Sequence, residues 1–383
     1  MKGRHERRAE PGTGARAGAQ NGAQLGAEKS GRSDGAGRDE MNVALIHGPR
    51  DVRIGTRPMP RPAEDRLLLR VRAVGICGSD LHYYLEGGIG SAQVNEPTVI
   101  GHEFAAEVID ERANEFGFDR GQLVAVDPAE SCGQCEFCLD GYPNLCPDVR
   151  FAGAPPFDGA LAEYVTAKPQ TLFKVPDSFD PATTALLEPL GVAIHALELA
   201  RLKPMESVAV LGAGPIGLLL MQVAKRSGAG KVYVVDPLAY RTRLATELGA
   251  DAVTNRVDAV TEWTAGRGVD VVLEATNSPR GPQDAVDAVR IGGRLVLVGV
   301  PEGDSFTLTA SIARRKGLTI KMSRRMGHVY PAAIQMVEEG EVQLLPLVSH
   351  RFPLTGTPEA FALHSDYRDG VIKSVIELPS GGA

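Results

Sequence analysis

A glycine-rich turn between an apolar strand and an apolar helix constrains the fold of this chain more than any other feature. Its sequence is Gly212-Ala-Gly214-Pro-Ile-Gly217, after the strand-like run 208–211 and before the helix-like run 216–224. In this context glycines permit a tight turn and let backbone N–H groups approach a pyrophosphate at the positive end of the helix. The sequence therefore predicts a dinucleotide-binding unit.

The segments around this turn predict an α/β fold with two domains. After Ser207, strand-like and helix-like runs alternate, which is typical of a doubly wound parallel sheet. Before it, short strands broken by Gly and Pro indicate a compact β-rich domain. A chain of 383 residues is long enough for both. The predicted strands of the parallel sheet are 207–211, 231–235, 269–274, 294–298 and 318–321, and its first helices are 215–227 and 238–248.

Asp236 follows the second predicted strand of this unit. A carboxylate at this position accepts hydrogen bonds from the adenosine ribose and repels a 2′-phosphate. The sequence therefore favours NAD over NADP, although Arg241 is a residue that would suit NADP.

The five cysteines fall into two groups. Four of them are closely spaced, and thiols at such spacing favour metal ligation over disulfides and predict a closed, structural zinc site. Cys77 stands apart, but with His102 and Glu103 it supplies the S, N and O ligands of an open zinc site. The four clustered cysteines are Cys132, Cys135, Cys138 and Cys146.

The stretch GICGSDLHYY (75–84), together with GHE (101–103), resembles the catalytic zinc site of the medium-chain alcohol dehydrogenases, and within them the sorbitol/xylitol (polyol) dehydrogenases. The resemblance runs from about Met41 to the C-terminus. It implies a GroES-like catalytic domain interrupted by a Rossmann domain. The expected parts are a disordered tail (1–40), the first part of the catalytic domain (41–187), the NAD-binding domain (188–323) and the rest of the catalytic domain (324–383).

The resemblance also implies roles for individual residues. Cys77, His102 and Glu103 match the ligands of the catalytic zinc. Glu188 matches a second glutamate, which is either an inner ligand or a partner of the metal's water. Ser79 and His82 match a proton relay that runs through the nicotinamide ribose. Alternatively, Ser79 caps a helix and His82 is merely exposed.

Further matches concern substrate and cofactor. Tyr83, Glu188 and Arg325 match polyol-contacting positions, although Arg325 could touch only the cofactor. Arg241 matches a position beside the adenosine of NAD, which keeps NAD as the expected cofactor. The complete set of expected cofactor contacts is Gly212, Gly214, Ile216, Gly217, Asp236, Arg241, Val298, Val300 and Arg325.

The expected activity is reversible oxidation of a secondary alcohol of a polyol to a ketone with NAD and zinc. L-Threonine dehydrogenase, butanediol dehydrogenase and a non-catalytic NAD-binding relative are the alternatives. The net charge of −7 argues against nucleic acid or an anionic membrane as partner, and no apolar run is long enough to span a bilayer. We therefore expect a cytoplasmic protein. We also expect it to form a homodimer or homotetramer. The sequence leaves open which polyol is used, the chirality attacked and the coordination of Glu188.

Overall fold

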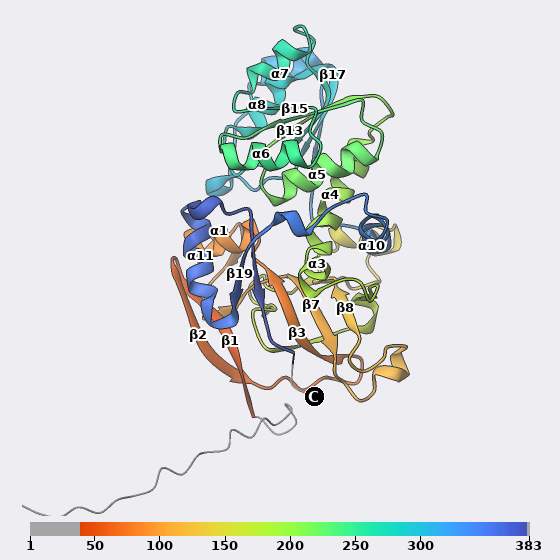
Figure 1. Cartoon of the computed structure of the whole chain (residues 1–383), viewed down its shortest axis with the longest axis vertical. Helices are drawn as coiled ribbons and strands as arrows, with labels where there is room; N and C mark the ends of the chain where they lie inside the picture. The colour runs from red at the N-terminus through yellow and green to blue at the C-terminus, as the bar shows by residue number, and fades with distance from the viewer. Residues whose placement is uncertain (1–38, 381–383) are drawn as a thin grey trace, which may run out of the picture. The chain divides into compact units, whose positions relative to one another are not determined.

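The computed structural model describes residues 39–380 (Figure 1). The predicted tail lies outside the described residues except for its last two positions, and Glu40 is the first residue of a strand. That strand pairs antiparallel with its successor over eight residue pairs, and together with β6 the two form a three-stranded sheet of order β2–β1–β6. The bounds are β1 (Glu40–Gly48), β2 (Asp51–Pro58) and β6 (Thr98–Val99).

A seven-stranded sheet forms the centre of the β-rich region. Its order is β12–β8–β7–β3–β20–β19, and β11 also pairs with β3. Strand β3 alternates buried and half-buried side chains, which is the pattern of a strand with one face on a core. Because β20 pairs with β3, the last described strand joins the sheet that the early strands form. The strands are β3 (Leu67–Gly75), β7 (Glu103–Val108), β8 (Leu123–Val126), β11 (Tyr164–Ala167), β12 (Leu172–Lys174), β19 (Val348–Pro353) and β20 (Lys373–Glu377).

Short strands, short helices and 3₁₀ turns connect these sheets. The strands are β4 (Gly88–Ile89), β5 (Ala92–Gln93), β9 (Ala129–Glu130) and β10 (Arg150–Phe151). The helices are α1 (Gly78–Glu86), α2 (Glu136–Leu139), α3 (Pro181–Ala185), α10 (Tyr330–Glu338) and α11 (Thr357–Ser365). The 3₁₀ turns are η1 (Ala113–Phe116), η2 (Pro143–Leu145), η3 (Pro169–Thr171), η4 (Glu302–Asp304), η5 (Leu345–Leu347), η6 (Leu354–Gly356) and η7 (Arg368–Gly370).

Six parallel strands form the second large sheet, in the order β15–β14–β13–β16–β17–β18. The order reverses between β13 and β16, which is where ligands bind in open α/β sheets. The predicted fold class is therefore confirmed. The strands are β13 (Ser207–Leu211), β14 (Lys231–Val235), β15 (Ala252–Thr254), β16 (Val269–Glu274), β17 (Val289–Leu297) and β18 (Thr319–Met322).

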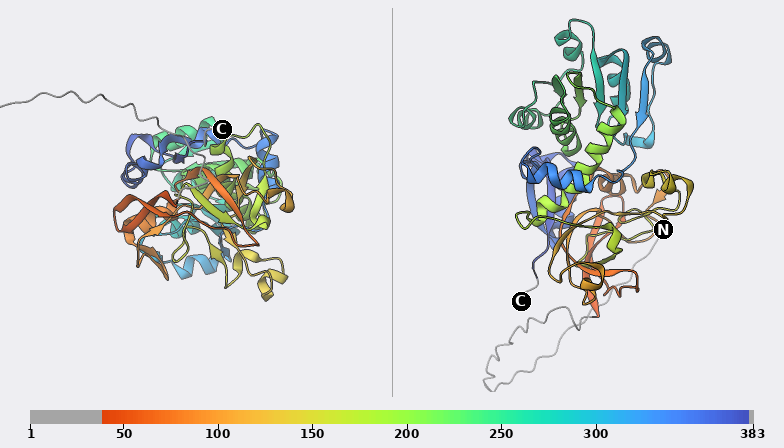
Figure 2. Two further views of the ribbon diagram at one scale, coloured as in Figure 1. Left: turned by 90° about the horizontal axis from the view of Figure 1, so that it is seen from below. Right: turned by 90° about the vertical axis from the view of Figure 1, so that its right-hand side faces the viewer.

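Helices cover both faces of this parallel sheet (Figure 2). Along β13, Val208 and Val210 face a core shared with α4 and α5, whereas Ala209 and Leu211 face one shared with α7 and α8. None of the helices within residues 39–380 has the length and apolar character required to cross a membrane. The helices are α4 (Leu187–Ala200), α5 (Pro215–Arg226), α6 (Ala239–Glu247), α7 (Asp258–Trp263), α8 (Gly281–Ala288) and α9 (Ala310–Lys316).

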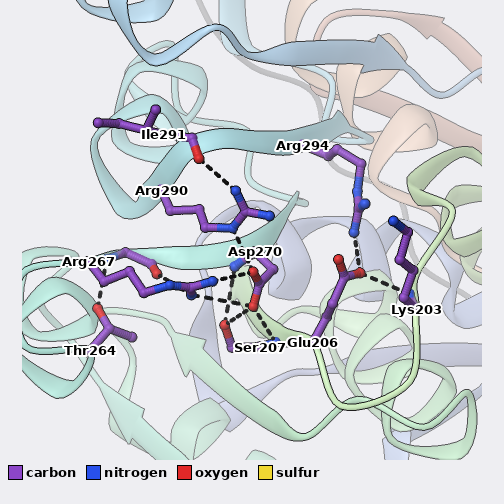
Figure 3. Close-up of polar contacts among 10 residues, drawn as sticks. Lys203, Glu206, Ser207, Thr264, Arg267, Asp270, Arg290, Ile291 and Arg294 are labelled. Carbon is purple, nitrogen blue, oxygen red and sulfur yellow. Dashed lines mark hydrogen bonds and ion pairs between the residues drawn. The ribbon is translucent and has the colours of Figure 1, made fainter.

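A polar network joins the amino ends of the central strands (Figure 3). Asp270 in β16 accepts hydrogen bonds from Ser207 in β13, from Arg290 in β17 and from Arg267. Burial raises the pKa of Asp270, but these hydrogen bonds outweigh it and hold the pKa below its usual range. The amino edge is thus fixed by internal bonds, and the carboxyl edge carries the glycine-rich turn.

Candidate active site

Helix α1 begins at the cysteine that stands apart from the other four. Cys77 occupies the N-cap position, and its backbone N–H donates to Oδ2 of Asp80 at 3.0 Å. Asp80 therefore closes the first turn. The alternative interpretation of Ser79 as the cap is wrong, because Ser79 already lies inside the helix.

Cys77, His102 and Glu103 come together beside this helix. One potential ligand atom from each lies within 4.8 Å of the others. Glu103 begins β7 directly opposite Gly75 in β3, where an added Cβ would lie 2.2 Å from Glu103 Oε2. Glycine at position 75 therefore leaves room for the carboxylate. A donor set of one thiolate, one imidazole and one carboxylate fits zinc.

The ring of His102 is oriented by Asp80. Its Nδ1 lies 3.4 Å from Oδ1 of Asp80, and its Nε2 lies 3.4 Å from Oγ of Ser79. Burial lowers the pKa of His102, but Asp80 and Cys77 outweigh it and raise the pKa well above its usual value. A metal ion would displace the proton from Nε2 while the proton on Nδ1 stays bonded to Asp80, which is the usual support of a ligand histidine.

Lys373 completes the surroundings of Glu103, and the sequence did not reveal it. Its Nζ donates to both carboxylate oxygens of Glu103, at 2.8 and 2.7 Å, and to the carbonyl of Ile76 at 2.9 Å. Both side chains are almost fully buried. Burial lowers the pKa of Lys373, but Glu103 outweighs it and raises the pKa overall. The pairing of β20 with β3 places this lysine.

Glu188 lies in the first turn of α4 and is buried. Burial raises the pKa of Glu188 to about 8, while His102 opposes this shift and Glu103 adds to it. Asp127, which the sequence also did not reveal, adds to it as well, and burial raises its own pKa to about 6. The buried site therefore concentrates several carboxyl groups around one imidazole.

Tyr83 and Arg325 lie within electrostatic reach of each other. The Arg325 guanidinium lies 4.5 Å from the ring centre of Phe151, and its buried Nη1 has no hydrogen-bond partner among residues 39–380. Burial lowers the pKa of Arg325 to about 10 and is also the largest cause that raises the pKa of Tyr83. A charged donor without a partner points to a bound polar group.

His82 lies one helical turn beyond Ser79 on the same face of α1. Its Nδ1 lies 2.7 Å from Oε1 of Glu86, and its Nε2 lies 3.2 Å from the carbonyl oxygen of Val300. The His82 side chain is only 11% exposed, whereas that of Glu86 is 33% exposed. His82 is thus not simply an exposed histidine, and Glu86, which the sequence did not single out, is its neighbour toward solvent.

The predicted cofactor residues lie at the carboxyl edge of the parallel sheet. Gly212 has φ +90, and a Cβ on Gly217 would lie 1.7 Å from the Gly212 oxygen. Gly214 is the N-cap of α5, so this turn meets the positive end of a helix. Ile216 belongs to the first turn of that helix, and Val298 and Val300 follow the last residue of β17.

Asp236 is buried at the end of β14, where its oxygens accept from the N–H groups of Ala213 and Leu238 at 2.7 and 2.8 Å. Each oxygen keeps a lone pair. The nearest Arg241 nitrogen is 3.7 Å from the Asp236 carboxylate. Asp236 therefore stiffens the glycine-rich turn and can still accept hydrogen bonds from a ligand.

The four remaining cysteines form a separate cluster whose sulfur atoms all lie within 4.8 Å of one another. Cys135 is the N-cap of α2, and Cys146 directly follows η2. Cys146 is buried and the other three are half-buried. Four thiolates would fill all four positions of a tetrahedral zinc ion and leave none open, as in a structural zinc site.

Comparisons with known proteins give two matches to domain families. Residues 63–177 match the alcohol dehydrogenase GroES-like domain, and residues 215–339 match the zinc-binding dehydrogenase family. The chain is 37% identical over 341 residues to sorbitol dehydrogenase of Bacillus subtilis (strain 168), and the match covers 88% of this chain and 97% of that protein. The chain belongs to the zinc-binding dehydrogenases. The predicted family and class of enzyme are therefore confirmed.

Solved structures of zinc-binding dehydrogenases and related enzymes share this fold. L-Idonate 5-dehydrogenase of Escherichia coli K-12 superposes with a TM-score of 0.82 and 29% identity, covering 88% of this chain and 98% of that one. A structure from E. coli CFT073, described as a short chain alcohol dehydrogenase complexed with NADH, has a TM-score of 0.79 and 28% identity, covering 89% of this chain and all of that one.

Proposed function

We propose that this zinc-binding dehydrogenase oxidises a secondary alcohol of a polyol to a ketone, with NAD as the cofactor. The observation that carries the proposal is the buried Nη1 of Arg325, which has no hydrogen-bond partner among residues 39–380. Arg325 lies within electrostatic reach of Tyr83, which in turn lies within electrostatic reach of Cys77 and His102. A hydroxyl-rich substrate supplies acceptors for this guanidinium and for the phenol. The likeness to a sorbitol dehydrogenase over nearly its whole length supports the same substrate class.

The chain's own residues divide the work. When bound, zinc supplies a Lewis acid that lowers the pKa of an alcohol, and NAD accepts the hydride. Cys77, His102 and Glu103 hold the metal, with Asp80 orienting His102. The turn Gly212–Gly217 and Asp236 hold the dinucleotide. Glu188 is buried within electrostatic reach of His102 and Glu103, where it would either ligate the metal or accept a hydrogen bond from its water.

Protons leave along α1 in this proposal. Ser79 Oγ lies beside the ligand nitrogen of His102, where it would accept the alcohol proton as it gives up its own hydroxyl proton. His82 lies one turn further, where its Nε2–H donates to the carbonyl of Val300, and when the ring is protonated it would release the proton on Nδ1 to Glu86, which reaches solvent. The step from His82 to Glu86 follows the direction of increasing exposure.

The proposed compartment is the cytoplasm, because all five cysteines are placed to ligate metal rather than to pair as disulfides, as expected in a reducing environment. We also propose a homodimer or homotetramer. Strand β18 is an edge strand with exposed Ile320 and Met322, and an uncovered apolar edge favours pairing with a second copy. Light scattering on the purified protein tests the assembly.

A substrate panel tests the proposed activity. NADH absorbance is followed with sorbitol, xylitol, ribitol, 2,3-butanediol and L-threonine, each with NAD and with NADP. We expect the highest kcat/KM for a polyol with NAD. A higher value for butanediol or threonine would contradict the substrate class, and no turnover in protein that contains two zinc ions would favour a non-catalytic relative.

A further inference from the structure

Asn144 links the cysteine cluster to the active site. It lies in η2, two residues before Cys146, and it is only 5% exposed although much of the surrounding segment faces solvent. Its Nδ2 donates to the backbone carbonyl of Arg324 at 3.0 Å and also lies 3.4 Å from Nε2 of His195. Both partners belong to segments that carry proposed active-site residues, Arg325 and Glu188.

The hydrogen-bond chemistry fixes the direction of these contacts. An amide nitrogen only donates, so Nε2 of His195 is the acceptor. Nδ1 of His195 then carries the hydrogen and donates to Oε2 of Glu198 at 3.3 Å. Both hydrogens of the Asn144 amide are therefore directed out of the cysteine segment. If Asn144 only stabilised the cysteine segment, its amide hydrogens would bond within that segment, but both bond outside it.

The backbone at Arg325 needs such support. Its φ is +56, in the left-handed region that non-glycine residues adopt only when the surrounding structure holds them there. On one side, Asn144 holds the carbonyl of Arg324. On the other, buried Met326 packs against Gly191 of α4, where a Cβ would lie 2.4 Å from the Met326 sulfur. These two contacts flank the residue whose guanidinium has a free donor.

We propose that Asn144 is a positioning residue that holds Arg325 in the orientation required to bind a substrate hydroxyl. The cysteine segment then contributes to substrate selection as well as to the stability of the fold. This inference rests on the proposed role of Arg325 as a donor to the polyol. It also predicts that Asn144 affects polyols more than alcohols without additional hydroxyls.

The test uses the nearly isosteric variant Asn144→Asp in the zinc-loaded enzyme. The carboxylate cannot donate, so the bond to Arg324 is lost. We expect kcat/KM for sorbitol to fall roughly three- to tenfold, the range of one net hydrogen bond, with kcat/KM for 2-propanol nearly unchanged. Zinc content should stay at two per chain. Gln134→Glu, an exposed position in the same segment, adds the same charge and should match wild type.

A double-mutant cycle separates this inference from the proposed function. Arg325→Ala alone should lower kcat/KM for sorbitol, and an unchanged value would overturn the proposed substrate role of Arg325. In the Arg325→Ala background, Asn144→Asp should have no further effect on sorbitol.

Three outcomes would overturn the positioning role of Asn144 without affecting the proposed role of Arg325. They are additive losses of kcat/KM in the double variant, equal losses for sorbitol and 2-propanol, and no loss from Asn144→Asp although Arg325→Ala is impaired. If Asn144→Asp fails to fold, Asn144→Ala removes the same bond without adding charge and enters the same cycle.

Discussion

The two groups of zinc ligands are assembled in opposite ways. The four cysteines come from one short segment, 132–146, and three of them are half-buried. The other group combines the start of α1 with the start of β7, and its histidine and glutamate are buried. It is supported by Asp80 in α1 and by Lys373 in the last strand of the chain.

Because of this difference, we expect the cysteine cluster to affect mainly stability and the buried ligand group to affect mainly turnover. A segment that holds all four ligands can close around a metal with little help from the remaining fold, so the metal mainly stabilises that segment. The buried group forms only when β3, β7 and β20 are paired, so the fold is needed to assemble it. Changes at the two groups should therefore have different consequences.

The largest expected effect is on turnover in Cys77→Ser. Without the thiolate the open zinc site loses its metal or binds it loosely. The Lewis acid that lowers the pKa of a bound water from about 15.7 to about 7 is then lost. We expect kcat to fall more than about 10⁴-fold with a small change in melting temperature. Steady-state kinetics and zinc analysis measure this. A variant that keeps two zinc ions and most of its activity would contradict the assignment.

Cys135→Ser should have the opposite profile. One zinc ion is lost and the free energy of unfolding falls, since the binding free energy of a structural zinc is part of the folding free energy. The remaining zinc should support some turnover at low temperature. Zinc analysis and urea unfolding provide the measurement. A single zinc ion in reconstituted wild type would refute the separation of the two sites.

The local group and the parallel sheet were predictable because their signals are local. Cysteine spacing, the glycine-rich turn and the strand–helix alternation can each be read from short stretches. The strands at 207–211, 231–235 and 269–274 match the structure residue for residue. Strand β17 starts earlier than predicted, at Val289, because Val289 already pairs with Val269 of β16, and an irregular stretch that contains a glycine pair separates this contact from the regular pairing that begins at Arg294.

The support of the buried group could not be predicted in the same way. Lys373 stands in an apolar run, which signals a buried charge that needs a partner, but 270 positions separate it from Glu103. Only the pairing of β20 with β3 identifies that partner. Asn144 gives still less signal, because its acceptors at Arg324 and His195 lie on segments far along the chain.

Lys373→Met tests whether the buried group depends on distant support. Removing one partner of a buried ion pair leaves the Glu103 carboxylate uncompensated, and we expect a loss of about 3 kcal/mol in unfolding free energy. Lys373→Met combined with Glu103→Gln should recover part of that loss. Urea unfolding of the metal-free proteins measures both variants. Equal stability of wild type and Lys373→Met would show that the pair does not support the site.

We expect acid to lower the stability of the region around Lys373 through His364. Its Nε2 accepts from the N–H of Ser374, next to Lys373. Burial, followed by Lys373, lowers the pKa of His364 to about 3. Below pH 6.5 the unfolded chain takes up a proton that the folded chain excludes, so stability falls as the pH falls and is regained above pH 6.5.

Between pH 6.5 and 5 this cost reaches about 2 kcal/mol, at about 1.4 kcal/mol per unit. His364→Gln keeps an acceptor for Ser374 and should be less sensitive to acid by that amount. Urea midpoints at several pH values measure the difference between the two proteins. If stability depends on pH equally in both proteins, His364 is not the cause of the acid sensitivity.

The smallest effect is expected at the solvent side of the buried group, in His82→Ala. His82 is proposed to hand a proton to Glu86, which is more exposed, so water and buffer can partly replace it. We expect kcat to fall about tenfold, below the 10²–10⁴-fold typical of general acid–base catalysis, and added imidazole to restore part of the loss.

The Ser79→Ala variant should lose more activity than His82→Ala and should not respond to imidazole, because Ser79 lies beside His102 in the half-buried first turn. Profiles of kcat against pH for both variants, with and without imidazole, make the comparison. If His82→Ala matches wild type throughout, the proton does not leave along this face of α1, and the buried group requires another outlet.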